Sequence, residues 1–437
     1  MTQLDAAPSA VRRNAGWIWV IAALALCHAH AIASLHVVNI LVDPIKASLS
    51  ISDTQFSLLQ GAAVAILAGV LGLPMARIAD GGRRRTVILA GLLVWSAGSL
   101  LSAFAQDFAS MFAARAMVGV GEIVLFPAAL SWIYDAAPPK RIAAAIGAFG
   151  AGGPLGAAAA LAGGGWLVAH AEDVGRVAPW LANFESWRVA FLALAFLGVV
   201  AAAALALAPG DRSGAGAGRA ASTGLAQELW RDWRAYAGVS GGFIMFSIAV
   251  LAINAWAPTY LIRVRGLDAE AAGGLVGAVA ISGAVAGAWL AGIAADALRV
   301  RGRSDAAILL AIGFVGLLAV SALGLVVVVP LGLATVFLFA AYALMATPTV
   351  LGGFALQQIS PPAMRAQIMA LHVLLVNVIA LTAGPAGVAL TTDYVFGAPA
   401  AVGQSLALVV TIAAALAIAT FVVTKRAFKT SAELREC

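Results

Sequence analysis

Residues 76–85 read Ala-Arg-Ile-Ala-Asp-Gly-Gly-Arg-Arg-Arg and join two long apolar runs, residues 54–78 and 86–105. A helix crosses a bilayer with about 20 mostly apolar residues, so each run is long enough to span a membrane. The charged loop between them is too short to form a domain of its own. The same alternation of apolar run and short polar loop continues along the chain and predicts an all-α membrane protein.

The composition excludes most soluble classes of protein. The 437 residues are 62% hydrophobic and 11% charged, with a mean hydropathy of +0.98, whereas soluble domains carry about 25% charged residues. A disordered chain, a secreted disulfide scaffold and a cytosolic enzyme are therefore excluded. Cys27 and Cys437 are too few for a disulfide framework or a cysteine-based metal site.

Counting apolar runs predicts twelve transmembrane helices. They cover approximately residues 17–41, 54–78, 86–105, 108–132, 141–168, 187–208, 236–261, 270–295, 306–329, 331–357, 363–391 and 401–424. The first run follows Arg12 and Arg13 like a signal peptide, but its apolar stretch continues to Val42, which favours a membrane span. The alternating ten-residue segments of a β-barrel are not visible.

The charges of the loops predict the orientation. One side of the membrane would carry twenty Lys and Arg residues, including both termini, and the other side only five. Cytoplasmic loops carry the excess of positive charge, so both termini are expected in the cytoplasm, in a bacterial inner membrane. The net charge of +6 is explained in this way, without a nucleic-acid partner.

A linker divides the chain into two halves. Residues 209–224 are rich in Gly, Ala and Ser, as in flexible linkers, and residues 225–235 predict an amphipathic interfacial helix. The expected organisation is a six-helix bundle at 1–208, a cytoplasmic linker at 209–235, a second six-helix bundle at 236–424 and a cytoplasmic tail at 425–437.

The two halves resemble each other at an offset of 216 residues. Leu59, Gly61, Ala62, Ala68, Ala79 and Asp80 match Leu275, Gly277, Ala278, Ala284, Ala295 and Asp296. Two prolines precede both the fifth and the eleventh span, Pro138-Pro139 and Pro361-Pro362. Two pseudo-symmetric, parallel six-helix repeats are the layout of the major facilitator transporters.

The motifs resemble the same superfamily. The loop at 76–85 is similar to its signature G-x-L-A-D-R-x-G-R-R, with Ala76 and Gly81 in place of the first Gly and the Arg after Asp. Four further stretches resemble its Spinster-like branch: Asp43-Pro44-Ile45-Lys46, Ser52-Asp53-Thr54-Gln55, Arg115 to Glu122, and Trp187 to Phe191. The resemblance implies proton-coupled transport of lysolipids and sphingolipid-type amphiphiles.

One departure concerns the first span. Spinster-like proteins commonly carry Asp-Arg nine residues before the acidic-Pro-Ile-Lys step, and here Ser34 and Leu35 stand there, followed by His36. A proton site at this aspartate is therefore not carried over, and whether His36 replaces it is open.

Arg115 and Glu122 are the ionisable residues expected deep inside a span. Seven residues apart on a helix, they face nearly the same direction and lie about 10 Å apart along the axis. Charges at membrane depth mark functional sites, so the pair is the predicted proton-coupling site. A fixed ion pair between helices is the alternative.

Polar residues of the central spans are expected to line a substrate cavity. They are His36, Asn39, Asn254, Trp256, Tyr260, His372 and Asn377. The spacing of His36, Asn39 and Asp43 predicts one helical face. For each residue, a hydrogen bond to a neighbouring helix is the alternative.

The ends of the second and eighth spans predict a cytoplasmic gate. Its residues are Asp80, Arg84, Arg85, Arg141, Asp296 and Arg365. In the family, the loop that carries the first Asp packs against the eleventh span, and by symmetry Asp296 is expected near the fifth. The glycines of the fifth span, Gly147, Gly150, Gly152, Gly153 and Gly156, predict close helix packing.

The sequence thus predicts a proton-coupled secondary transporter, not an enzyme, that moves an amphiphilic, anionic substrate by alternating access. A symporter of carboxylates or other small organic anions, anchored by Arg115, is the alternative. A membrane-embedded enzyme for lipid-linked substrates and a transporter-like receptor are the rivals from other classes. Protons, membrane lipids and a small-molecule or lipid-like substrate are the expected partners of a monomer with no metal or cofactor.

Overall fold

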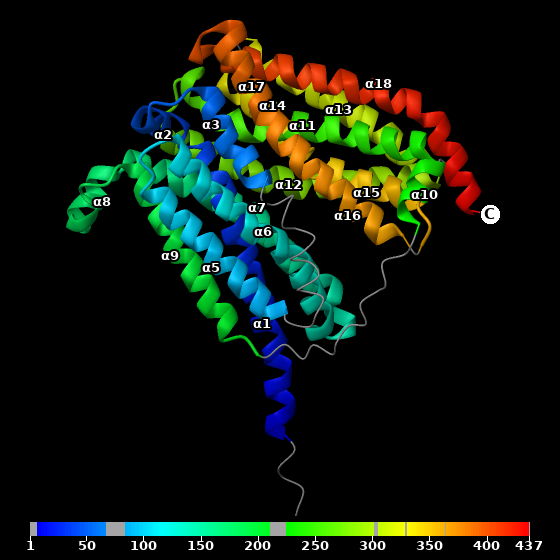
Figure 1. Ribbon diagram of the computed structural model, residues 1–437, viewed down its shortest axis with the longest axis horizontal. Helices are drawn as coiled ribbons and strands as arrows, with labels where there is room; N and C mark the ends of the chain where they lie inside the picture. Colours follow the sequence, from blue (N-terminus) through cyan, green and yellow to red (C-terminus); the bar gives the residue numbers. More distant parts are fainter. Residues whose placement is uncertain are drawn as a thin grey trace, which may run out of the picture. The chain divides into compact units, whose positions relative to one another are not determined.

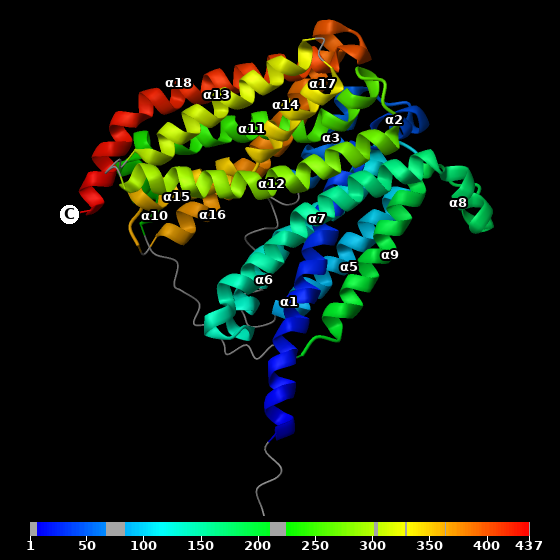
Figure 2. The same ribbon diagram turned by 180° about the vertical axis from the view of Figure 1, so that it is seen from behind.

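The computed structural model describes residues 7–66, 84–209, 224–300, 305–327, 330–362 and 364–436. The regular structure in these ranges is helical throughout, with no strand (Figures 1 and 2). The predicted all-α class is confirmed. The reason is physical: a backbone in hydrocarbon must satisfy its own hydrogen bonds, which a helix does within one segment.

The first half of the chain forms these elements: α1 (Ala7–His36), η1 (Val37–Asn39), α2 (Val42–Leu49), α3 (Asp53–Gln60), α5 (Arg84–Ala103), α6 (Phe108–Ala136), η2 (Pro139–Arg141), α7 (Ile142–Ala169), α8 (Ala171–Val177), η3 (Pro179–Leu181) and α9 (Ser186–Ala206).

The second half forms these elements: α10 (Leu225–Arg231), α11 (Trp233–Arg263), α12 (Ala269–Val300), α13 (Ala306–Val326), α14 (Leu331–Ala343), α15 (Thr347–Ile359), α16 (Arg365–Leu375), η4 (Val376–Ala380), α17 (Leu381–Leu390), η5 (Thr391–Phe396), η6 (Pro399–Ala401) and α18 (Val402–Glu436). The segments η4 and η5 are π-helical.

Eleven helices of the described residues are long and apolar enough to cross a membrane. They correspond to eleven of the twelve predicted spans. The remaining prediction, 54–78, begins in α3 and continues past residue 66, where it lies outside the described residues. The observed helices extend beyond several predicted ends: the seventh runs over Trp233–Arg263 where the apolar pattern predicted 236–261.

Capping residues fix where two of the helices begin. Ser52 and Gln55 form a reciprocal capping box at α3, and Asp107 and Ser110 form another at α6. Each box satisfies backbone N–H groups that the first turn of a helix leaves without partners. The start of α3 is therefore defined by its own sequence.

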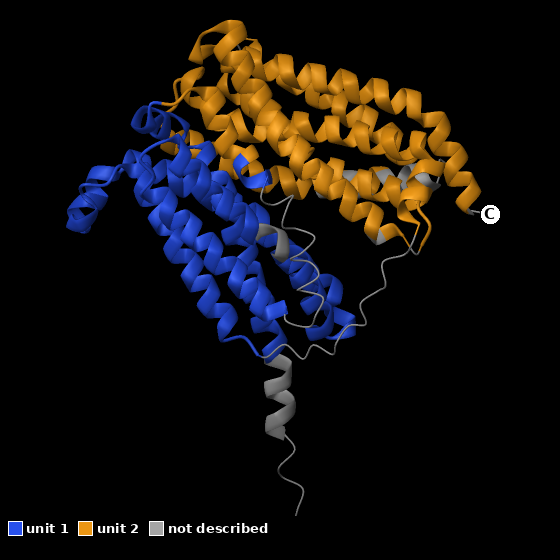
Figure 3. Cartoon of the chain, in the orientation of Figure 1, with its two compact units in different colours: residues 1–50, 63–218 blue, residues 51–62, 219–437 orange. Residues whose placement is uncertain are grey.

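The chain divides into two compact units (Figure 3). Unit 1 comprises residues 1–50 and 63–218, and unit 2 comprises residues 51–62 and 219–437. Residues 51–62, which contain α3, therefore belong with the second half of the chain although the repeat pattern places them in the first.

Glycines let the helices of unit 1 pack closely. A Cβ atom at Gly156 of α7 would lie 2.0 Å from the carbonyl oxygen of Ala29 on α1, and one at Gly152 would lie 2.4 Å from that of Ala25. Gly147 and Gly150 have nothing within 4 Å of such an atom. Gly152 and Gly156 therefore allow α7 to pack closely against α1, whereas Gly147 and Gly150 make no such contact.

Two buried carboxylates hold the end of α18 in unit 2. Asp305 is fully buried and lies 3.3 Å from Lys425 Nζ and 3.5 Å from Lys429 Nζ. Glu228 of α10 pairs with Arg435. Glu228 therefore lies on the buried side of α10, whereas Trp230 is 80% exposed. The interfacial location of this helix stays a prediction.

Candidate functional site

Arg115 lies fully buried in the first third of α6. Its Nη1 donates a 2.8 Å hydrogen bond to the carbonyl oxygen of Ser34 in the last turn of α1. The last carbonyls of a helix lack partners within the helix, and the helix dipole makes a cation favourable there. Arg115 therefore ties α6 to the end of α1.

The first span is interrupted just after this contact. Helix α1 ends at His36, a 3₁₀ turn covers Val37–Asn39, and α2 begins at Val42. Pro44 supplies the physical reason, because it has no N–H group to donate to the carbonyl of Ile40 and its ring excludes a continuous helix there.

This break corrects one expectation. His36, Asn39 and Asp43 were expected on one face of a continuous helix, and the structure distributes them over α1, η1 and α2. His36 is half-buried and Asn39 is buried. The Nδ1 of His36 lies 2.9 Å from the Ile32 carbonyl oxygen, so this nitrogen carries the proton and donates.

Helix α6 also carries Glu122 without interruption. The side chain of Glu122 lies outside the described part of the structure, and its pairing with Arg115 stays a prediction. The backbone beside it is tightly held: a Cβ atom at Gly119 would lie 2.1 Å from the Val64 carbonyl oxygen, and one at Gly121 would lie 2.5 Å from that of Gly91. Two close helix contacts therefore hold the backbone of α6 just before residue 122.

Two of the predicted cavity residues in unit 2 are bonded to neighbouring helices. Trp256 is fully buried in α11, and its Nε1 donates to the carbonyl oxygen of Pro385 at 3.0 Å. Tyr260 is also fully buried and donates to the carbonyl oxygen of Leu325 at 2.8 Å. For Trp256 and Tyr260, the structure therefore shows the alternative to a cavity role, which is a hydrogen bond to a neighbouring helix.

The other three predicted residues differ in exposure. Asn254 is 7% exposed and lies 3.5 Å from Met345 Sδ, and His372 is 4% exposed near Gly352. Asn377 is exposed and lies in the π-helical segment η4. Such segments inside helices occur frequently at functional sites, and the cavity role of Asn377 stays a prediction.

The predicted gate residues are described in part. Asp80 lies outside the described residues, as does the side chain of Asp296. Arg84 pairs with Asp135 at the end of α6 and donates to the Ser131 carbonyl oxygen at 3.2 Å. Arg84 therefore joins α5 to α6.

The remaining gate residues lie near the surface. Arg85 is half-buried, Arg141 and Arg365 are exposed, and Arg365 Nε donates to the Ser360 carbonyl oxygen at 3.3 Å. Two exposed arginines at helix starts are free to change partners without a large cost of desolvation.

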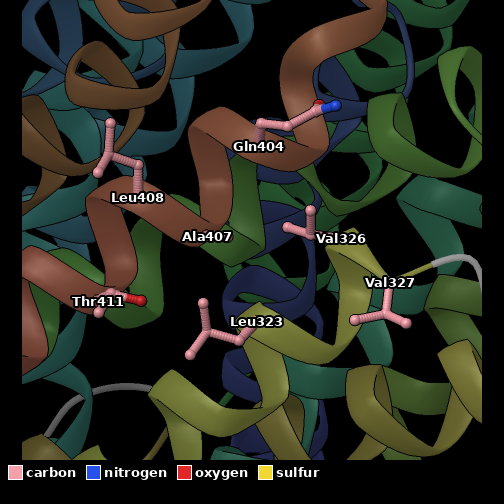
Figure 4. A pocket seen from close by; sticks show the side chains of 7 residues that line it. All are labelled: Leu323, Val326, Val327, Gln404, Ala407, Leu408 and Thr411. Atoms are coloured by element: carbon pink, nitrogen blue, oxygen red, sulfur yellow. The ribbon is translucent and has the colours of Figure 1, made fainter.

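A groove of about 470 Å³ lies between α13 and α18 (Figure 4). It is lined by Leu323, Val326, Val327, Gln404, Ala407, Leu408 and Thr411. The lining contains no charged side chain and none of the predicted site residues. It is therefore not the predicted polar cavity.

Buried ion pairs at helix ends were missed from the sequence. Asp53 pairs with Arg263, and Asp305 pairs with two lysines. Asp53, Arg263 and Asp305 lie beside apolar runs and read as loop charges, so nothing in the pattern reveals their burial. Lys425 and Lys429 are 36% and 41% exposed. Within the described residues, no group of three His, Cys, Asp or Glu side chains could hold a metal ion.

The family model of the Major Facilitator Superfamily matches residues 23–357. An MFS-type efflux pump of Mycolicibacterium smegmatis is 28% identical over 265 residues, 60% of this chain and 58% of that protein. The puromycin resistance protein pur8 of Streptomyces alboniger is 35% identical over 137 residues, 31% of this chain and 27% of that protein. The chain thus aligns with less than two thirds of the length of either relative.

Solved structures share the fold over nearly the whole chain. A bacterial homologue of the human lysosomal transporter Spinster, inward-facing and unoccupied, has a TM-score of 0.75 at 21% identity, with 96% of this chain and 98% of that chain covered. A mutant of the nucleoside transporter NupG has a TM-score of 0.73 at 11% identity, with 93% and 99% covered. At these identities the likeness concerns the fold.

Proposed function

Because the chain belongs to the Major Facilitator Superfamily, we propose that it is a proton-coupled secondary active transporter that works by alternating access. Membership in this superfamily of membrane transporters bears out the expectation that the chain is not an enzyme. The proposed substrate is an organic, amphiphilic and anionic molecule of lysolipid-like chemistry. The observation that carries the proposal is the fully buried Arg115 beside the interrupted first span.

The coupling step follows from the electrostatics of α6. A charged side chain at the bilayer centre costs about 2.5–3.5 kcal/mol on insertion scales, so Glu122 and Arg115 gain by neutralising each other. When Glu122 takes up a proton, that neutralisation is lost and the guanidinium attracts an anionic group of the substrate. When the proton leaves, the restored carboxylate competes with the substrate for Arg115.

A symporter of carboxylates or other small organic anions is the second candidate. The observation that favours it is again Arg115, since a rigid guanidinium binds a carboxylate with two parallel hydrogen bonds. The two candidates differ in the apolar part of the substrate. Competition between lysophospholipids and small carboxylates for uptake separates them.

The proposal also includes the cytoplasmic gate and the location of the protein in the membrane. Asp80, Arg84, Arg85, Arg141, Asp296 and Arg365 would form contacts that close the cytoplasmic side. The protein would act as a monomer in a bacterial inner membrane, with both termini in the cytoplasm. The excess of cations in the loops supports this orientation.

The test uses purified protein in proteoliposomes with an imposed proton gradient. The wild-type protein is expected to accumulate a radiolabelled lysophospholipid. Glu122→Gln is expected to abolish accumulation driven by the gradient and to retain exchange of substrate. Glu172→Gln, at an exposed carboxylate of α8, is the matched control. Wild-type pH dependence in Glu122→Gln would contradict the coupling role.

A further inference from the structure

Helix α3 is held to the second half of the chain by side chains at both of its ends. Residues 51–62 are grouped with residues 219–437 (Figure 3). In the repeat pattern the same residues begin the second span of the first repeat. The contacts of this segment therefore join parts of the chain that the two repeats supply separately.

The first contact is a buried ion pair. Arg263 Nη1 donates to Asp53 Oδ2 at 2.7 Å, and its Nη2 donates to Oδ1 at 2.9 Å. The side chains are 9% and 0% exposed. Two parallel bonds give the pair a defined geometry. Asp53 is the first residue of α3 and Arg263 the last of α11, so the pair joins two helix ends.

The second contact is a cap that comes from the eleventh span. Asp393 Oδ2 in η5 accepts from both the backbone N and the Oγ1 of Thr54, each at 2.7 Å. Ser52 caps the same helix start from within its own segment. A carboxylate at a helix N-terminus is favoured by the helix dipole, so Asp393 adds a second anion to the start of α3.

The third contact is a close approach of backbones. A Cβ atom at Gly61 would lie 2.1 Å from the carbonyl oxygen of Leu381. In an uninterrupted helix that carbonyl would accept from residue 385, which is Pro385 and has no N–H group. Gln60 Nε2 lies 3.4 Å from the Ala255 carbonyl oxygen in the same region. Only glycine allows α3 to reach the span at this point.

We propose that α3 is a releasable lock at the outer end of the transporter, with Asp53, Arg263, Thr54 and Asp393 as its positioning residues. The inference rests on the proposed function, because alternating access requires the two repeats to separate at each end in turn. Contacts that join the two repeats cannot all persist through such a cycle. The loop charges assign the ends of α3 and α11 involved to the outer side.

The contacts of the lock are polar, which suits contacts that must break when the outer end opens. Two carboxylates, a guanidinium and a helix N-terminus lie at helix ends, where water can replace each partner once the segment moves. A scaffold contact between the same helices would need only apolar packing, which is often as stable as a buried ion pair.

The test reports release without needing a substrate. Ser57 of α3 is fully buried, so Ser57→Cys in a Cys437→Ser background is expected to react slowly with a membrane-impermeant maleimide on intact cells. Cys27 is fully buried and contributes no fast reaction. Asp53→Asn or Arg263→Gln is expected to raise the labelling rate of the cysteine introduced at position 57 by roughly fivefold or more, the range of typical coupling between conformational states.

Two further variants separate the lock from a loss of folding. The exchange Asp53→Arg with Arg263→Asp is expected to return the labelling rate toward that of the wild type. Asp173→Asn, which removes an exposed ion pair of α8, is expected to leave the rate unchanged. If Asp53→Asn does not fold, the labelling rate of the cysteine at position 57 is measured in Thr54→Val instead, and the same increase is expected.

Unchanged labelling in folded Asp53→Asn and Thr54→Val would overturn the proposal, as would failure of the exchanged pair to restore the rate. Absence of flux in wild-type proteoliposomes, by contrast, would contradict the proposed function. That result leaves the labelling comparison as an independent measure of the lock.

Discussion

His36 and Asn39 lie three residues apart at the break in the first span, and their exposures differ. His36 is half-buried and Asn39 is 5% exposed. In the Cys437→Ser background, cysteine at position 36 is expected to react faster with a small polar thiol reagent than cysteine at position 39, because reaction requires an accessible thiolate.

Added substrate is expected to slow the reaction at position 36 if this residue lines the cavity. The measurement is the labelling rate in proteoliposomes with and without lysophospholipid. Complete inertness at both positions would remove them from the cavity. Equal rates would contradict the difference in burial.

At the scale of elements, the glycines of α7 offer a matched pair of substitutions. Gly156→Ala places a methyl group 2.0 Å from a carbonyl oxygen of α1, whereas Gly150→Ala meets nothing within 4 Å. Overpacking of this kind costs about 1–3 kcal/mol, while Ala in place of Gly in a helix stabilises by about 0.5–1 kcal/mol.

Gly156→Ala is therefore expected to lower the temperature at which the detergent-solubilised protein loses its monodisperse peak, and Gly150→Ala to leave it unchanged or raise it. Fluorescence-detected size-exclusion chromatography after heating measures both. An equal loss in the two variants would mean that α7 and α1 do not pack as the structure describes.

For the whole molecule, the charges of the loops predict how the chain is oriented in the membrane. Twenty cations on one side against five on the other predict that both termini lie in the cytoplasm. Green fluorescent protein fused after residue 437 is expected to fluoresce, and alkaline phosphatase at the same point to be inactive. The opposite pattern would invert every statement about inner and outer ends.

The sequence predicted the fold because hydropathy and family motifs report on long segments. Eleven predicted spans recur as helices. The π-helical segments depend on the packing of neighbouring helices and could not be predicted. The interruption at Val37–Asn39 has a local cause in Pro44, which a count of apolar residues does not take into account. Arg263 reads as a loop cation, and only the fold brings it to Asp53 and buries it.

The site was predicted less completely for the same reason. Arg115 was found because a cation in the middle of an apolar run has few explanations. Trp256 and Tyr260 carry donors that either a substrate or a helix carbonyl satisfies equally well. Which partner each one takes depends on the positions of Pro385 and Leu325, more than 60 residues away.

The grouping of residues 51–62 with the second half also bears on how the polypeptide tolerates being cut. A gene divided after residue 218 would produce a first fragment that carries α3 as an exchanged element, as in domain-swapped proteins. The two fragments, expressed together, are expected to copurify through a tag on one of them, with no peptide bond between them. Gly61→Val in the first fragment is expected to reduce recovery of its partner, while Glu172→Gln leaves it intact. Equal recovery with Gly61→Val would mean that complementation relies on other surfaces.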